Sequence, residues 1–125
     1  VVLTPKALRH ARNSRYLDIP YAYRVLWFLS EHYVPARRDG GEGYKAGLVE
    51  LGLELSPVGR SATHHRSKET YSTDYKQERV PLDWHVKGSS DRDPRYGFRI
   101  YFHWHSDDQC MVVGSMPEHL DNLLT

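Results

Sequence analysis

Side chains that can transfer protons, hold anions or stack on bases recur at every second position in two short segments near the C-terminus. They are Asp83, His85, Lys87, Arg99, Tyr101, His103 and His105. Histidine acts as a general acid or base near neutral pH, and arginine can hold a phosphate through two parallel hydrogen bonds. Metal-free cleavage of an RNA phosphodiester needs a base for the 2′-hydroxyl, cations for the phosphorane and an acid for the leaving oxygen. The set offers a residue for each task.

Two other interpretations of this set stay open. Antiparallel sheets commonly have one solvated face, so the residues could form an ordinary surface, although three histidines are an unusual choice for one. Alternatively, His103 and His105 point the same way on a strand and could bind a metal together with His85 or Asp83. The HxH pattern is short, and no CxxC or HExxH motif accompanies it. We therefore expect neither a metal nor another cofactor.

The alternation itself predicts the strands that carry these residues. Val80–Lys87 and Phe98–His105 each alternate over eight residues, with apolar side chains such as Trp84 and Phe102 directed to the core. Cys110–Gly114 is expected to pair back as a third strand after a turn. Residues 58–77 are polar and irregular, and predict a loop or an edge strand. His119, near the end of the chain, could approach the polar face, although a surface position is more common.

The first half of the chain predicts helices. Thr4-Pro5 and Asp18-Ile19-Pro20 are typical helix starts, with an N-cap residue followed by proline. The first helix should reach about residue 15, with Ala7, Leu8 and Ala11 facing inward. The second should be the central core helix, contain Trp27 and end at Pro35. A loop at residues 37–43 and a third helix over about 44–55 would follow, and Val1–Leu3 could form a short strand.

Length and composition fit one small domain. The chain has 125 residues, of which 39% are hydrophobic and 26% charged. We expect a single α+β domain, with N-terminal helices (1–57), a polar connection (58–79), and a C-terminal antiparallel sheet of three to four strands with a tail (80–125). No run approaches the ~20 apolar residues of a membrane helix. With a single cysteine, Cys110, and no visible secretory signal, we expect a cytoplasmic location.

Charge is unevenly distributed along the chain. Residues 1–38 hold seven Lys or Arg against two acidic residues, a net +5, and the remainder holds ten against fourteen, a net −4. Lys6, Arg9 and Arg12 recur every three residues and would fan over one side of the first helix. Such a helix could steer an anion such as RNA, or it could be a plain solvated face.

Three segments of the C-terminal third form a recognisable series: Arg99-Ile100-Tyr101-Phe102, then Val112-Val113-Gly114 after a turn, then Pro117-Glu118-His119-Leu120. This series resembles the last strands of the RelE/ParE superfamily of bacterial toxins. The resemblance covers about 30 residues, and the third helix and polar insertion depart from it. RelE-like members cleave messenger RNA on the ribosome, whereas ParE-like members act on DNA gyrase and are not nucleases. The resemblance implies that Arg99 and Tyr101 stand where the family places catalytic basic and aromatic residues.

These observations lead to two functional hypotheses. The first is a toxin-type, metal-independent RNA endonuclease, with RNA or the ribosome as target and a cognate antitoxin as partner. Its catalytic residues would be His85, Arg99, Tyr101 and His103: Arg99 on the phosphate, Tyr101 orienting or stacking a base, and either histidine as acid or base. Its substrate-binding residues would be Lys87, Lys6, Arg9 and Arg12. The alternative is a non-enzymatic binding protein, such as a gyrase-directed toxin or an immunity or anti-defence factor, that uses the same face on a protein partner.

Overall fold

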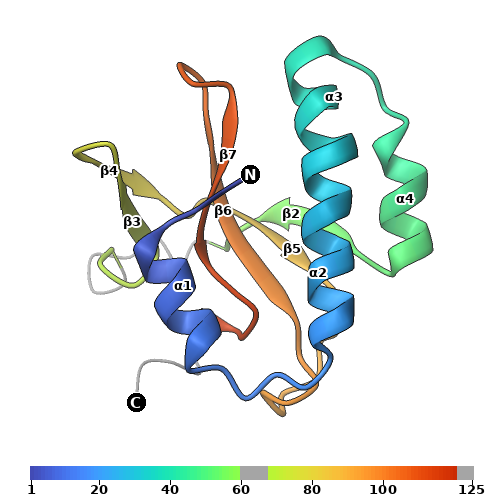
Figure 1. The fold of residues 1–125 in the computed structure, drawn as a ribbon, viewed down its shortest axis with the longest axis vertical. Coiled ribbons are helices and arrows are strands. Elements are labelled where there is room, and N and C mark those ends of the chain that lie inside the picture. The colour runs from blue at the N-terminus through green and yellow to red at the C-terminus, as the bar shows by residue number, and fades with distance from the viewer. Residues whose placement is uncertain (60–67, 121–125) are drawn as a thin grey trace.

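The computed structural model describes residues 1–59 and 68–120, and these form an α+β fold (Figure 1). A five-stranded sheet has the order β1-β7-β6-β5-β2, in which only β1 and β7 are parallel. Its strands are β1 (Val2–Leu3), β2 (Glu54–Pro57), β5 (Trp84–Lys87), β6 (Arg99–His105) and β7 (Cys110–Ser115). A separate hairpin consists of β3 (Ser72–Tyr75) and β4 (Glu78–Pro81). The α+β prediction is therefore confirmed.

Both predicted helix starts are present. The Thr4 hydroxyl accepts a hydrogen bond from the Ala7 amide (3.2 Å) at the start of α1 (Pro5–Arg12), and the Asp18 carboxylate accepts one from the Tyr21 amide (3.2 Å) before α2 (Ile19–Phe28). Both caps satisfy amides that a helix leaves unpaired at its first turn. Of the α1 residues expected to face inward, only Ala7 is buried, whereas Leu8 is 47% exposed and Ala11 is also exposed.

The second helix does not end at Pro35. A π-helical turn (Leu29–Tyr33) joins α2 to α3 (Val34–Asp39), and the Val34 amide donates to the carbonyl of Leu29. This wide turn places Pro35 at the start of α3, where a proline without an N–H is tolerated. The helix ends instead at Gly40, whose φ of +87° favours glycine. The expected loop at residues 37–43 is correspondingly shorter.

Two other predicted boundaries were wrong. The third helix, α4 (Tyr44–Leu51), ends at Gly52 in the left-handed conformation (φ +72°), so Leu55 lies in β2, which pairs with β5. The predicted strand Val80–Lys87 is two strands, β4 and β5, that belong to different sheets. Its alternation continues across the break, where Pro81 lacks an amide donor. Leu82 in the break packs with Tyr101 and Leu120 rather than with the helices.

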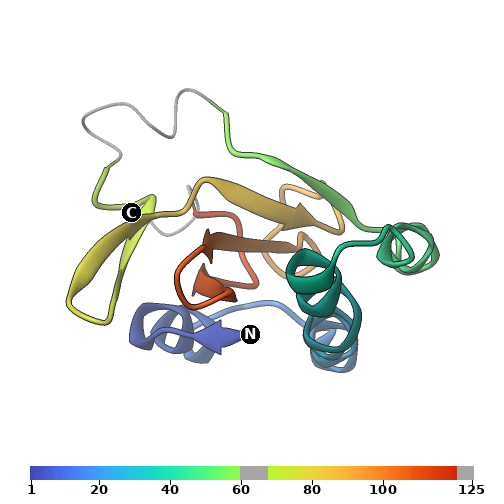
Figure 2. The same cartoon turned by 90° about the horizontal axis from the view of Figure 1, so that it is seen from above.

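The core lies between the helices and one face of the sheet. Val86, Ile100, Phe102 and Val113 are fully buried there against α2 and its neighbours, as the alternation predicts. Figure 2 shows α1 and α2 on the same side of the sheet, with the β3–β4 hairpin and α4 at opposite ends. Trp27 is 63% exposed, so it does not contribute to the core as expected. Among the described residues, no helix has the length and apolar character needed to cross a membrane.

Candidate functional site

The pairing of β5 with β6 brings four of the predicted site residues together. His85 lies opposite Tyr101 and Lys87 opposite Arg99 in the antiparallel register. Side chains at paired positions project from the same face and are close neighbours. The face is the one turned away from α2, as expected from the alternation of polar and apolar residues. The four side chains therefore form one cluster.

Tyr101 is the centre of this cluster rather than an exposed member of it. Its ring makes edge-on contacts with His85 (5.7 Å between centroids), His119 (6.1 Å) and Tyr71 (5.7 Å). The side chain is only 2% exposed, and its hydroxyl accepts a hydrogen bond from the Leu120 amide (3.4 Å). A base cannot lie on a ring enclosed in this way. Tyr101 instead contacts two histidines, His85 and His119, through its ring.

A pocket of about 360 Å³ opens beside Arg99 and is bordered by Arg92, His119 and the loop that joins β5 to β6. Arg99 Nη1 donates to the carbonyls of Ser89 (2.7 Å) and Phe98 (3.1 Å), so its guanidinium is anchored to this loop. Two arginines and a histidine face a single carboxylate, Asp91, among the side chains that line the pocket. The pocket therefore suits an anion, because arginine matches the geometry of phosphate and carboxylate.

His85 has the electrostatics of a general base. Burial lowers its pKa below the usual imidazole value, and the charges of Arg99, Lys87 and His119 lower it further, against a smaller opposing effect of Glu54. Its Nε2 is 3.0 Å from Ser56 Oγ, and its buried Nδ1 has no hydrogen-bond partner among the described residues. The imidazole is therefore neutral at physiological pH, with Nε2 as the nitrogen that meets another polar group.

The lowered pKa of His85 should make the protein less stable in mild acid. Between the folded and the unfolded pKa, the unfolded chain binds more protons, so the free energy of unfolding falls as the pH drops below about 6.5. We expect His85→Gln to flatten this dependence in urea unfolding followed from about pH 7.5 to pH 5. His10, whose pKa is also lowered by burial, still contributes to the pH dependence of stability in this variant. His32→Gln, at an exposed site, is the control. If the free energy of unfolding of His85→Gln depended on pH as steeply as that of His32→Gln, the lowered pKa assigned to His85 would be wrong.

His103 lies farther along β6 and has a different partner. Its Nδ1 is 3.1 Å from Asp83 Oδ1, while His105 pairs with Glu78 and accepts a hydrogen bond from the Asp108 amide (3.2 Å). Neither His103 nor His85 lines the pocket beside Arg99; His85 lies close enough to Arg99 for its charge to act on the imidazole, whereas His103 has Asp83 as its partner. Within residues 1–59 and 68–120, no three His, Cys, Asp or Glu side chains are arranged to hold a metal ion. His103, which was predicted to be catalytic, is therefore paired with Asp83. The two histidines that contact the Tyr101 ring are His85 and His119.

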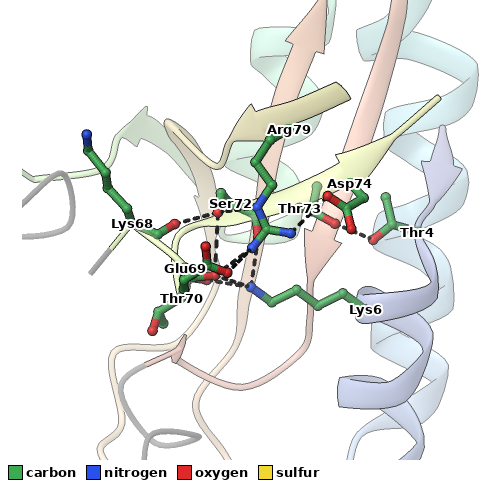
Figure 3. Close-up of polar contacts among 9 residues, drawn as sticks. All are labelled: Thr4, Lys6, Lys68, Glu69, Thr70, Ser72, Thr73, Asp74 and Arg79. Carbon is green, nitrogen blue, oxygen red and sulfur yellow. Dashed lines mark hydrogen bonds and ion pairs between the residues drawn. The ribbon is translucent and has the colours of Figure 1, made fainter. Parts of the chain in front are cut away.

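Lys6 is engaged within the protein. Its Nζ donates to the carbonyls of Glu69 (3.1 Å), Thr70 (2.7 Å) and Ser72 (2.8 Å), which ties α1 to the β3–β4 hairpin (Figure 3). Arg79 reinforces the tie through ion pairs with Glu69 and Asp74. Burial, assisted by the charge of Arg79, lowers the pKa of Lys6 to about 8. Arg9 and Arg12 are exposed on α1, which packs on β7 rather than on β5 or β6. That these three residues bind substrate stays a prediction.

Removal of the Lys6 ammonium should loosen the hairpin. Lys6→Met keeps the aliphatic stem but deprives three carbonyls of their donor, and we expect a loss of about 1–3 kcal/mol in the free energy of unfolding. Lys45→Met is the matched control, because Lys45 is exposed and its ammonium pairs with Glu42, three residues earlier in the chain. Urea denaturation measures both. Equal free energies of unfolding for Lys6→Met and Lys45→Met would show that the hydrogen bonds of Lys6 do not stabilise the fold.

Comparisons of the chain with models of known protein families, with curated proteins and with solved structures found no match. The resemblance to the RelE/ParE superfamily therefore rests on the sequence features alone.

Proposed function

We propose that the protein is a toxin-type, metal-independent endoribonuclease whose reactive site is the His85 cluster and the adjoining pocket. One observation carries the proposal. A histidine whose pKa is lowered by burial lies near Arg99, Lys87 and His119, and two of these, Arg99 and His119, line a pocket together with Arg92. An anion in that pocket would relieve the repulsion among these cations, and a phosphodiester is an anion whose cleavage uses a neutral imidazole.

The proposed reaction is transfer of the phosphoryl group to the 2′-hydroxyl of the same nucleotide. His85 Nε2 takes the proton of that hydroxyl, which replaces Ser56 as its partner. The 2′-oxygen attacks phosphorus, the bond from phosphorus to the 5′-oxygen breaks, and the imidazolium of His119 gives its proton to the leaving oxygen. Arg99 and Lys87 stabilise the charge on the phosphorane. The products are a 2′,3′-cyclic phosphate and a 5′-hydroxyl, and Tyr101 positions both imidazoles.

The biological setting follows from the resemblance to RelE-like toxins. We take messenger RNA, free or on the ribosome, as the substrate, and a cognate antitoxin as the protein that would restrain the activity in the cytoplasm. The basic N-terminal part of the chain, with Arg9 and Arg12 exposed on α1, would attract RNA over a longer range.

A binding protein without catalytic activity is the second candidate, and α2 favours it. Ile19, Tyr23 and Trp27 are spaced four residues apart on this helix and are all exposed. Aromatic side chains on a helix face often anchor protein interfaces. Such a protein could be a gyrase-directed toxin or an immunity or anti-defence factor. Its interface would consist of this face of α2, alone or together with the sheet face.

Induction of the protein in bacteria distinguishes the candidates. Growth and messenger RNA integrity are followed for the wild type, for His85→Gln, for Arg99→Ala and for the control His103→Gln, each checked for folding by circular dichroism. We expect arrest with fragmented RNA, which is lost in His85→Gln and Arg99→Ala but retained in His103→Gln. Arrest with intact RNA would favour the binding protein, and RNA fragmentation that survives in both site variants would contradict the proposed site.

A further inference from the structure

A second and larger pocket borders the same loop as the proposed phosphate pocket. It has a volume of about 630 Å³, and four aromatic rings, Tyr16, Tyr21, Tyr96 and Phe98, stand around it. Phe98 packs against Tyr16 and Tyr21 with centroid separations of 5.3 and 5.2 Å. Phe98 also lines the pocket that contains Arg99, so the two pockets share this residue and the loop that joins β5 to β6. A ligand with two parts of different character could occupy both.

The charges that line this pocket favour an uncharged ligand. Among the described residues that line it, the only cation is Arg95, which forms an ion pair with Asp93 at 2.6 Å, and that pairing raises the pKa of Arg95. The only carboxylate among them is Asp18, the cap of α2. A phosphate would meet no unpaired cation among these side chains, whereas a flat ring would meet the exposed Tyr96 and the half-buried Tyr21. The size lies within the usual range for small-molecule sites.

The rim of the pocket is held in place rather than loosely exposed. The carbonyl of Asp93 accepts hydrogen bonds from the amides of Tyr96 (2.9 Å) and Gly97 (3.0 Å), and the Leu17 amide donates to the carbonyl of Arg95 (3.0 Å). These bonds fix Tyr96, a large aromatic side chain that is nevertheless 49% exposed, with the Arg95 guanidinium 5.1 Å from its ring centroid. A positioned but exposed tyrosine is available for stacking.

Gly88 keeps the floor of the pocket open. A Cβ atom at this position would lie 3.0 Å from Phe98 Cδ1 and 3.0 Å from Tyr21 Oη. Tyr21 Oη cannot easily withdraw, because it donates a hydrogen bond to the carbonyl of Leu51 (2.7 Å). Any side chain here would therefore press into the space between the rings.

We infer that this aromatic pocket binds a nucleobase of single-stranded RNA, next to the nucleotide whose phosphate lies beside Arg99. The inference rests on the proposed function and names its substrate as a single strand. A base within a duplex is already stacked and paired, whereas a base in a single strand can turn out onto aromatic side chains. The neutral pocket takes the base, and the cationic pocket takes the phosphate.

Binding without cleavage tests this inference. The His85→Gln protein is titrated, at one salt concentration, with a fluorescein-labelled short uridine oligonucleotide and with the same ribose-phosphate chain lacking its bases. We expect the oligonucleotide with bases to bind about 5- to 150-fold more tightly, the range for one stacked base. Tyr96→Ala should abolish this preference and Tyr96→Phe should keep it. Tyr23→Ala, at an exposed tyrosine of α2 outside the pocket, should also keep it.

The results separate this inference from the nuclease proposal. A preference for bases that depends on Tyr96, in a protein whose wild type cleaves no RNA, would support the pocket and overturn the nuclease. Cleavage by the wild type with equal binding of both oligonucleotides would overturn the pocket and leave the nuclease in place. Equal losses in Tyr96→Ala and Tyr23→Ala would also overturn the pocket, because the effect would not be specific to it.

Discussion

His85→Gln is expected to lower the rate of RNA cleavage by about 10²- to 10⁴-fold, the usual contribution of a positioned acid or base. Glutamine is close in size to histidine but cannot take the proton of the 2′-hydroxyl. Single-turnover cleavage by the purified protein measures the loss. Because burial and the neighbouring cations lower the pKa of His85, the wild-type rate should fall only below the pH at which an ordinary histidine becomes protonated.

His103→Gln is the matched control for this prediction. His103 is on β6, the strand next to that of His85, and its imidazole pairs with Asp83, so we expect its removal to change the rate by only a few-fold. A loss in His103→Gln equal to that in His85→Gln would move the chemistry away from the Arg99 pocket. A His85→Gln protein that keeps the wild-type rate would remove His85 from the mechanism.

Tyr101→Ala is expected to lower the free energy of unfolding by about 3–5 kcal/mol, as for other large buried aromatic residues. The ring is enclosed by Leu82, Leu120 and three other rings, so its removal would leave a cavity among them. Tyr101→Phe should cost about 1 kcal/mol, since it loses the hydrogen bond from the Leu120 amide, and should keep cleavage within a few-fold. Urea denaturation and the cleavage assay give both quantities.

Tyr23→Ala is the control for stability, and we expect a change of about 0.5 kcal/mol or less because Tyr23 is 70% exposed. The decisive variant is Tyr101→Phe. If it were fully stable and yet inactive, the phenol hydroxyl would take part in the chemistry, and the positioning role assigned to Tyr101 would be wrong.

Alternation of side chains predicted the strands and faces of the sheet well, because a strand that is buried on one side allows only one register. Trp84 and Phe102 are paired on the core face and His85 and Tyr101 on the other, as the period of two requires. The same period concealed the division of Val80–Lys87. Alternation reports the direction of each side chain but not which sheet a strand joins, and the pattern passes unbroken through Leu82.

The candidate site was predictable only where it lies on regular strands. Periodicity placed His85, Lys87, Arg99 and Tyr101 on one face. It could not place His119 or Arg92, which come from irregular segments whose course depends on the tertiary fold. Lys6 shows the opposite difficulty. A basic residue on a helix looks like a solvated or RNA-binding side chain until the segment that supplies its carbonyl partners is known.

The most direct test of the nuclease account is incubation of the purified protein, with EDTA present, with a single-stranded RNA and with its 2′-O-methyl counterpart. The proposed reaction uses the 2′-hydroxyl as nucleophile and needs no metal. We therefore expect cleavage of the RNA into fragments that end in a 2′,3′-cyclic phosphate and begin with a 5′-hydroxyl, while the 2′-O-methyl strand stays intact. An uncut RNA, or equal cleavage of both strands, would contradict the mechanism assigned to His85, Arg99 and His119.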